Sequence, residues 1–435
     1  MEASEILAEY LPIATTTGLL VAACVFGMIF SLKASITGVY LSLFLGQLIR
    51  IPLQGQGGGL LVSDIAVLVF LLSLFVSLLR GELPFYTKKI FLASIAISPF
   101  LLWGLAVLVA HVGVYQMVDI RISFLYWIRL AVVLSLLPAA LIATSLPSIF
   151  SSMKKGFVYL YGALLVAGFV QLFFLPSLAG FVDNGWDPHI DRMVSTWLDP
   201  NFLGIFFVVF LPIFLYWMPH KVSAITRIFW LFFAVVAIGL TESRSSYLAL
   251  LVAGLCCGII WVFSSKISGN WKKAIVPGGV LLVIIFSGSI TLLRERAYQV
   301  FFHDPTIALR AESYRSVWRF LVSPNMLFGV GYNAYQFAAA NENLVSSFSV
   351  HSRAGSDNSI FTILVTTGMV GALLFFTPML LGVVFHIRRW LFMRSYNSLF
   401  FVWATIALLV HAQFVNSILY PHVLIPYIIF AALTL

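Results

Sequence analysis

The feature that most constrains this sequence is a series of long apolar runs separated by short polar segments. Hydrophobic residues make up 61% of the 435-residue chain, and charged residues make up only 9%. Soluble domains carry roughly 25% charged residues, so the composition excludes a soluble globular protein, a disordered chain and a disulfide scaffold. We therefore expect a membrane protein that crosses the bilayer many times.

The apolar runs predict about twelve transmembrane helices, since roughly 20 apolar residues are needed for each crossing. They lie at residues 12–31, 36–53, 60–79, 90–110, 123–147, 156–180, 199–218, 228–241, 246–264, 274–292, 359–385 and 397–417. The runs are long and do not alternate, which favours helices over a β-barrel. The expected fold class is an all-α polytopic membrane protein, with residues 1–435 forming one integral membrane domain. A last apolar segment, 423–435, is too short to cross and is expected to be a re-entrant piece or the start of a further span.

The cations are sorted by type between the two sides of the predicted bundle. Every lysine falls in loops that we assign to the cytoplasm, because positive charge near span ends sets orientation. The first ten residues hold three glutamates and no lysine, so they should face outward and are not a signal peptide. On the outer side, or near the outer membrane face, the cations are all arginines: Arg50, Arg121, Arg129, Arg192, Arg244, Arg294, Arg296, Arg310, Arg315, Arg319 and Arg353. Either lysine is avoided in translocated loops, or guanidinium forks bind phosphate or carboxylate groups of a lipid or an acidic glycan.

The longest hydrophilic stretch, residues 293–357, is expected to be an outer loop between the tenth and eleventh spans. Within it, 311–322 is predicted to form an amphipathic helix that lies in the membrane interface. The charged face would hold Glu312, Arg315 and Arg319, and the apolar face would hold Tyr314, Val317, Trp318 and Leu321.

Four outer segments carry most of the polar chemistry. They are residues 191–201, residues 241–246 around Arg244, the stretch with Arg310, Arg315 and Arg319 that leads to Gly329–Asn333, and residues 351–358. Structural explanations are available: Asp199 or Asn358 can cap a helix, Arg244 can extend from the bilayer to water, and the two glycines can form a turn. Aspartate and histidine are also the side chains that remove a proton from a hydroxyl near neutral pH, which makes Asp357 and His351 candidate bases.

Two charged residues, Asp64 and Arg129, fall inside predicted spans. Intramembrane charges are costly and mark functional sites by default, although these two can also pair with each other. His411, Gln413 and Asn416, at one end of the twelfth span, are weaker candidates. The sequence has no Walker loop, dinucleotide fingerprint, zinc motif or nucleophile elbow, so we expect no cofactor, no metal and no nucleic-acid partner.

Four motifs occur in an order that resembles the bacterial O-antigen ligase and O-antigen polymerase superfamily. They are Thr196–Gly204, Thr241–Ser246, Pro324–Tyr332, and Asp357-Asn358 followed by Gly368 and Gly371. The resemblance implies a helical membrane bundle with one long periplasmic loop. It also implies glycan transfer from undecaprenyl diphosphate at the periplasmic face of the bacterial inner membrane, without a nucleotide sugar or a metal.

The resemblance also implies roles for individual residues. Arg244, Arg192, Arg315 and Arg319 would hold the diphosphate, and Asp357 or His351 would deprotonate the acceptor hydroxyl, so that direct displacement inverts the anomeric centre. The remaining expected substrate contacts are Arg310, Asp199, Asn201, Tyr332 and Asn358. The expected partners are a lipid-linked oligosaccharide, an acceptor glycan and a chain-length regulator.

One departure from the family pattern bears on the activity. The ligases begin their last motif with a histidine, and here Asp357 takes its place, while His351 lies six residues earlier. We therefore expect a polymerase, with a ligase that acts on lipid A-core as the alternative. A flippase is a remote third choice, because transporters keep polar groups near the bilayer midplane, and a binding protein without catalysis is a further alternative.

Overall fold

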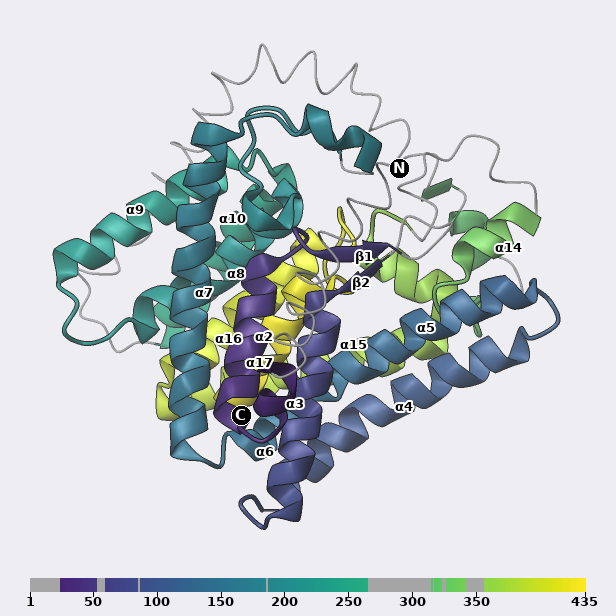
Figure 1. The fold of residues 1–435 in the computed structure, drawn as a ribbon, viewed down its shortest axis with the longest axis horizontal. Coiled ribbons are helices and arrows are strands. Elements are labelled where there is room, and N and C mark those ends of the chain that lie inside the picture. Colours follow the sequence, from purple (N-terminus) through teal and green to yellow (C-terminus); the bar gives the residue numbers. More distant parts are fainter. Residues whose placement is uncertain are drawn as a thin grey trace, which may run out of the picture.

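The protein is a helical bundle with one small antiparallel hairpin (Figure 1). The computed structural model describes residues 24–52, 59–84, 87–184, 187–264, 314–315, 317–322, 326–341 and 356–435. The elements, with η for 3₁₀ helices, are α2 (Leu32–Leu45), β1 (Arg50–Pro52), β2 (Gly59–Leu61), α3 (Val62–Leu79), α4 (Lys88–Ala110), α5 (Met117–Leu134), α6 (Leu136–Ala143), α7 (Pro147–Phe174), η1 (Ala179–Asn184), η2 (Ser195–Trp197), α8 (Pro200–Trp217), α9 (Ala224–Leu240), α10 (Arg244–Ser264), α14 (Tyr335–Asn341), α15 (Ser359–Met393), α16 (Tyr396–His411) and α17 (Pro421–Thr434).

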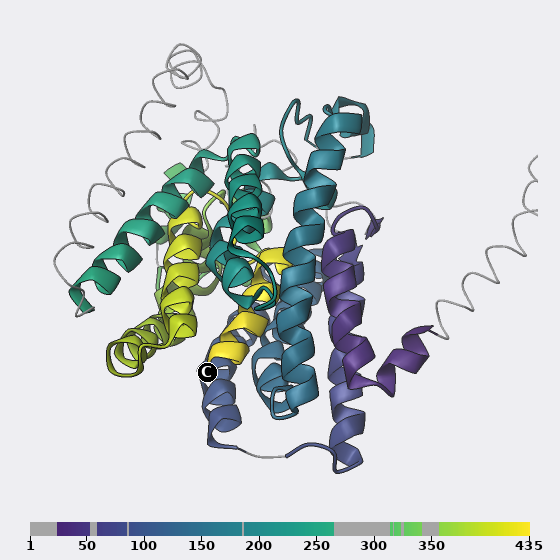
Figure 2. The same cartoon turned by 90° about the vertical axis from the view of Figure 1, so that its left-hand side faces the viewer.

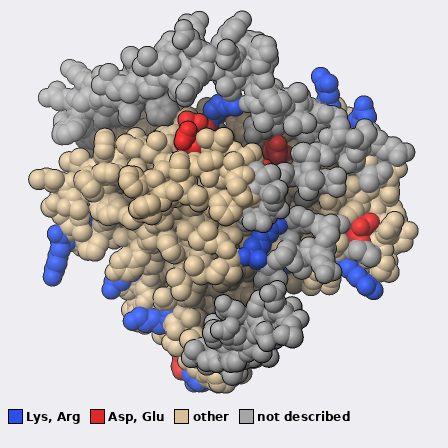
Figure 3. Space-filling model, turned by 45° about the horizontal axis from the view of Figure 1, so that its top comes forward, with Lys and Arg blue, Asp and Glu red and all other residues tan. Residues whose placement is uncertain are grey.

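Seven helical segments within the described ranges are long and apolar enough to cross a membrane. They are α3, α4, the α5–α6 segment, α7, α8, α10 and α15, and four shorter apolar helices, α2, α9, α16 and α17, accompany them. Large apolar side chains point outward, such as Ile225 at 80% and Phe263 at 85% exposed. Most of the described surface in Figure 3 carries no charge. The chain is therefore a multi-pass helical membrane protein.

Most predicted spans that fall on described residues are helices, but one was predicted wrongly. The run 36–53 is not one helix: α2 ends at Leu45, and the chain then enters β1, which pairs with β2 in the register Arg50↔Leu61. The run 123–147 corresponds to one apolar span, Asp119–Ala143, which is interrupted only at Ser135 between α5 and α6, because the ring of Pro138 clashes with the carbonyl of a residue four positions earlier. Most of 12–31 and all of 274–292 lie outside the described residues, as does most of the loop 293–357.

The last apolar segment forms a central helix. Nearly every residue of α17 is buried, and the helix packs against α5, α6, α7, α8 and α16; Figure 2 shows it, in yellow, between α16 and α7. At its end, Lys89 Nζ donates to Leu435 O at 2.6 Å and Arg389 Nη1 donates to Thr434 O. These cations satisfy carbonyls that a helix C-terminus leaves without partners.

Helix α15 contains a break at Gly368, whose φ of 69° and ψ of −177° are restricted to glycine. The chain from Leu327 to Gly331 packs directly onto this break. A Cβ atom at Gly368 would lie 2.2 Å from Leu327 O, and a Cβ atom at Gly329 would lie 2.5 Å from Gly368 N. Two motifs that are separate in the sequence are therefore in backbone contact and need glycine for the same reason.

The break leaves three carbonyls of α15 without helical partners, and other elements supply the donors. Val330 N donates to Val365 O and Gly331 N to Thr366 O, both at 3.0 Å. Trp103 Nε1, from α4, donates to Thr367 O at 2.7 Å. The Gly-Val-Gly segment is thus a docking turn, as its structural interpretation from the sequence predicted.

The predicted amphipathic helix at 311–322 is confirmed in part. Residues 314–315 and 317–321 are helical, with Arg315 and Arg319 exposed and Val317 buried. Trp318, on the predicted apolar face, does not pack against the rest of the protein: its side chain is 60% exposed, like membrane-facing residues such as Phe263. Phe320 is buried instead and packs edge-on against Tyr335, because positions three apart share one face of a helix.

Candidate functional site

A cavity of about 290 Å³ lies where several helices begin. Its wall comes from β1 and β2, from α5, from the first turns of α3, α8, α15 and α17, and from the segment after the Gly-Val-Gly turn. Besides aliphatic side chains, the wall holds two arginines, Arg50 and Arg129, and three amides, Gln47, Asn333 and Asn416. Tyr126, Tyr332, Tyr420 and Phe202 add aromatic rings. A polar cavity with convergent charged and aromatic groups is the default candidate for a binding site.

Four helices begin beside this cavity. Leu61 caps α3 and Tyr420 caps α17. Phe202 lies in the first turn of α8, and Thr362 lies in the first turn of α15. All four residues line the cavity. Helix N-termini carry partial positive charge, which adds to that of the two arginines. The cavity is therefore suited to a ligand that is negatively charged or rich in hydrogen-bond acceptors.

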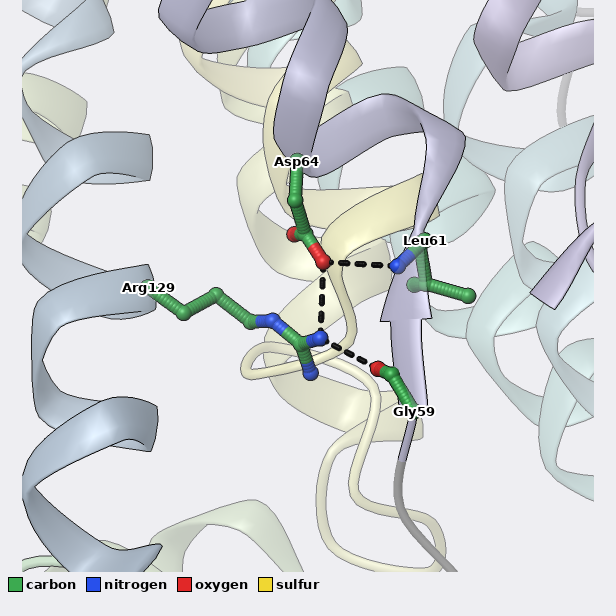
Figure 4. Close-up of polar contacts among 4 residues, drawn as sticks. All are labelled: Gly59, Leu61, Asp64 and Arg129. Atoms are coloured by element: carbon green, nitrogen blue, oxygen red, sulfur yellow. Dashed lines mark hydrogen bonds and ion pairs between the residues drawn. The ribbon is translucent and has the colours of Figure 1, made fainter. Parts of the chain in front are cut away.

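Arg129 in the cavity wall is held by Asp64 (Figure 4). Its Nη2 atom lies 2.7 Å from Asp64 Oδ2 and also donates to Gly59 O, and Asp64 Oδ2 accepts from Leu61 N at 2.9 Å. The side chains are only 19% and 9% exposed. The predicted pairing of the two intramembrane charges is confirmed, and breaking such a buried pair costs about 3–5 kcal/mol.

Asp357 and Asn358 lie at the end of α15 that borders the cavity. Asn358 caps the helix, because its Oδ1 accepts from Ile360 N at 2.8 Å and from Phe361 N at 3.0 Å, while its Nδ2 donates to Gln413 O at 2.9 Å. These bonds give Asn358 the capping function that the sequence offered as an alternative to a substrate contact. Asp357 precedes the cap and is half-buried. His351, the other candidate base, lies outside the described residues.

The start of α8 follows the capped pattern expected from its sequence. Asp199 Oδ1 accepts from Asn201 N at 2.7 Å and from Phe202 N at 3.2 Å, and Pro200 is the first helical residue. Burial raises the pKa of the Asp199 carboxyl, while the two backbone amides and the Arg192 charge act against the rise. Next to this cap, the rings of Phe202 and Tyr420 stack with centroids 3.8 Å apart in the cavity wall.

Arg192 connects two of the predicted motifs. Its Nε donates to Thr241 O at 2.9 Å and its Nη2 to Glu242 O at 3.4 Å, so it fixes the turn from which Arg244 starts α10. Burial lowers the pKa of the Arg192 guanidinium. The negative charges of Asp199 and Glu242 act against this shift, and the positive charge of Arg244 adds to it. The structure thus brings Arg192, Asp199 and Arg244 into one charged group.

The remaining predicted residues divide into three groups. Tyr332 lies in the cavity wall. Arg315 and Arg319 lie on the helix whose Tyr314 packs against Phe361 of α15 and donates to Gln413 O at 3.2 Å. Asn201 is half-buried at the start of α8, and Arg310 lies outside the described residues.

Sequence reasoning missed most of the cavity wall. Arg50 and Arg129 were visible as outer arginines, and Asn416 as a polar residue at a span end, but nothing placed them together. Gln47 and Tyr420 had no sequence signal, because single polar residues at loop ends are common, and Asn333 was named only as the end of the Gly329–Asn333 segment. The fold brings them together at the cavity, where Gln47 Nε2 donates to Tyr420 Oη at 2.9 Å.

Comparison with protein families gives one match: residues 228–376 fit the O-antigen ligase family. The similarity covers about a third of the chain, residues 228–376, which we name the O-antigen ligase domain after the matched family. It confirms the resemblance to the ligase and polymerase superfamily, and it implies a membrane enzyme that handles glycans. The O-antigen ligase domain includes Arg244, Asp357 and the break at Gly368, whereas Arg50 and Arg129 lie outside it. No curated protein matches the chain.

Proposed function

We propose that this protein is a membrane glycosyltransferase that polymerises repeat units of a surface polysaccharide, either O-antigen or exopolysaccharide. The donor would be linked to undecaprenyl diphosphate, and transfer would occur at the periplasmic face of the bacterial inner membrane. One observation carries the proposal: Asp357, inside the O-antigen ligase domain, lies at the end of α15 that borders a cavity with two arginines.

The mechanism is a single displacement. Asp357 removes the proton from the acceptor hydroxyl as its oxygen attacks C1 of the donor sugar, the bond from C1 to the diphosphate oxygen breaks, and the anomeric centre inverts. Arg244 is exposed and forms bidentate contacts with the leaving diphosphate. Arg192, already bonded to two carbonyls, contributes its charge from a fixed position. Arg315 and Arg319 lie on the neighbouring helix, and His351 is the alternative base.

The distribution of cations supports a periplasmic site. Lys89 and Arg389, which belong to the lysine-rich side of the sequence, meet the C-terminal end of α17, whereas the cavity lies at its N-terminal end. The 14 residues of α17 separate the two by about 21 Å at 1.5 Å per residue. The cavity is thus remote from the side assigned to the cytoplasm.

The substitution of aspartate for the ligase histidine favours polymerase over ligase. Asp357 stands at the histidine position, while Asn358, Gly368 and Gly371 keep the pattern. A ligase that transfers the finished chain to lipid A-core is the second candidate, and the description of the matched family, O-antigen ligase, favours it.

Glycan analysis in a strain that lacks the gene separates these functions. The strain is complemented with wild type, Asp357→Ala, Arg244→Ala or, as a control, Arg121→Ala, which changes an exposed arginine of α5. The polymerase is supported if the deletion strain carries single repeat units on the final carrier and only wild type and Arg121→Ala restore long chains. Long chains that stay on undecaprenyl diphosphate support the ligase. Lipid-linked repeats that accumulate on the cytoplasmic side contradict both, and normal chains with Asp357→Ala and Arg244→Ala contradict the assigned roles.

A further inference from the structure

The cavity wall contains buried polar atoms that have no hydrogen-bond partner within the described residues. They are Gln47 Oε1, Asn333 Nδ2 and Asn416 Oδ1, one atom from each lining amide. Buried polar atoms are almost always hydrogen-bonded, and terminal amide torsions are soft. A ligand in the cavity can therefore supply the missing partners after a small rotation of each amide.

The chemistry of these atoms restricts the ligand. As oriented, two of them are acceptors and one is a donor, and a half-turn of an amide exchanges the two, so a ligand group that both donates and accepts can pair with all three. Fully ionised phosphate or diphosphate has only acceptor oxygens, so it can pair only with the NH₂ side of each amide. Sugar hydroxyls can donate and accept, and the aromatic rings of Tyr126, Tyr332 and Tyr420 offer flat apolar surfaces beside them.

The charge of the wall restricts the ligand further. Among the described residues, those that line the cavity include Arg50 and Arg129 but no carboxylate. Arg129 uses Nη2 to bond both Asp64 and Gly59, and these bonds fix one side of the guanidinium plane. Its Nε and Nη1 atoms remain as donors for another acceptor. The Arg129 guanidinium also lies 5.2 Å from the centre of the Tyr126 ring, which fixes the plane from a second direction. A fixed, planar cation suits bidentate contact with a carboxylate.

We propose that this cavity is a subsite for an acidic sugar, with Arg129 contacting the carboxylate and Asp64 acting as the residue that positions Arg129. The proposal rests on the proposed function, since it names the class of glycan that the transferase accepts. It adds a contact outside the O-antigen ligase domain. Arg244 and Arg192 bind the donor diphosphate, and Arg129 binds the carboxylate of the sugar. The enzyme would then select repeat units that contain a uronic acid.

The test is direct binding of monosaccharides to the full chain in detergent, measured by saturation-transfer NMR. The probes are glucuronate, glucose and inorganic pyrophosphate. We expect glucuronate to bind at least about tenfold more tightly than glucose, since a charge-assisted hydrogen bond is worth about 1.5–3 kcal/mol. Pyrophosphate should not displace glucuronate. Equal affinities for glucuronate and glucose, or displacement by pyrophosphate, would overturn the proposal.

Variants locate the binding in this cavity. Arg129→Gln alone leaves Asp64 as an unpaired buried charge and can fail to fold, so the test uses Asp64→Asn with Arg129→Gln. This pair should lose the preference for glucuronate and keep weak glucose binding. Asn416→Asp, which places a carboxylate in the wall at constant size, should weaken glucuronate only. Arg121→Gln, on the same helix as Arg129 but exposed, should change neither affinity, and a preference for glucuronate that survives in the double variant refutes the site.

The binding assay and the complementation assay fail independently. Intact polymerisation with no glucuronate preference rejects the acidic-sugar subsite and leaves the proposed function in place. Conversely, glucuronate binding can depend on Arg129 while deletion of the gene changes no glycan. That result rejects the transferase function and leaves the sugar site in place.

Discussion

Replacing Gly368 with alanine should destabilise the protein strongly, because two costs coincide at the break in α15. Alanine would have to adopt φ of 69° and ψ of −177°, a conformation that costs a residue with a side chain about 1–3 kcal/mol. The new Cβ would also lie 2.2 Å from Leu327 O and 2.4 Å from Leu327 C, which are backbone atoms that cannot rotate away. Overpacking adds about 1–3 kcal/mol, so the expected loss is about 2–6 kcal/mol.

The same change should reach the cavity. If the segment from Leu327 to Gly331 moves away from α15, the bonds from Val330 N and Gly331 N are lost, at about 1 kcal/mol each. Tyr332 follows this segment directly and lies in the cavity wall. Glucuronate binding should therefore fall together with stability, and residual folded protein should bind it more weakly than wild type.

Thermal unfolding of the purified protein in detergent measures the first effect. Gly162→Ala is the matched control, since Gly162 lies within α7 and a Cβ there meets nothing within 4 Å. Alanine is favoured over glycine in a helix by up to about 1 kcal/mol. The control should therefore have an unchanged or slightly higher melting temperature. Gly329→Ala should behave like Gly368→Ala, because its Cβ would meet the same contact from the other side. If Gly368→Ala unfolds at the temperature of the control, the reasoning about the break is wrong.

Three further predictions concern charged groups. Arg244→Lys should reduce transfer by about 10²–10³-fold, because an ammonium cannot form the bidentate contact; near-normal chain length in complemented cells would contradict that contact. Asp357→Asn should lower the initial rate with a lipid-linked oligosaccharide by about 10²–10⁴-fold, and an unchanged rate would mean that another group is the base. Burial, and to a smaller extent Arg192, lower the pKa of His189 from 6.5 to about 4, while Asp187 acts against the shift. Since a depressed pKa stabilises the folded form above the unfolded value, this stability is present at pH 7 and is lost as the pH falls from 6.5 towards 4. Limited proteolysis of residues 175–199 should therefore speed up over that range in wild type and less in His189→Gln, and identical pH profiles would contradict the assignment.

The sequence predicted the helices well because their signals are local. Long apolar runs, an Asp-Pro start for α8 and an Asn cap for α15 depend on neighbouring residues only. The hairpin of β1 and β2 has no such signal: Arg50–Pro52 has the composition of a span end, and only its pairing with Gly59–Leu61 makes it a strand.

The site was predictable where chemistry alone decides. A buried aspartate and a buried arginine both need a partner, so the pairing of Asp64 with Arg129 could be expected across 65 positions of sequence. The cavity could not be predicted in this way. Its three amides with one unpartnered atom each, Gln47, Asn333 and Asn416, come from distant parts of the chain, and nothing about an isolated asparagine predicts that its neighbours will leave one of its polar atoms without a hydrogen-bond partner.

The central position of α17 has a consequence for how the protein is made. This helix packs against five others, yet it leaves the ribosome after all of them. Helices α2 to α16 must therefore be inserted while the place of α17 is filled by lipid or by loosely packed neighbours. Its N-terminal end also completes the cavity wall through Tyr420. Nascent chains that stop before Pro421 consequently lack a finished sugar site, and the enzyme gains its binding pocket only when translation has passed its central helix.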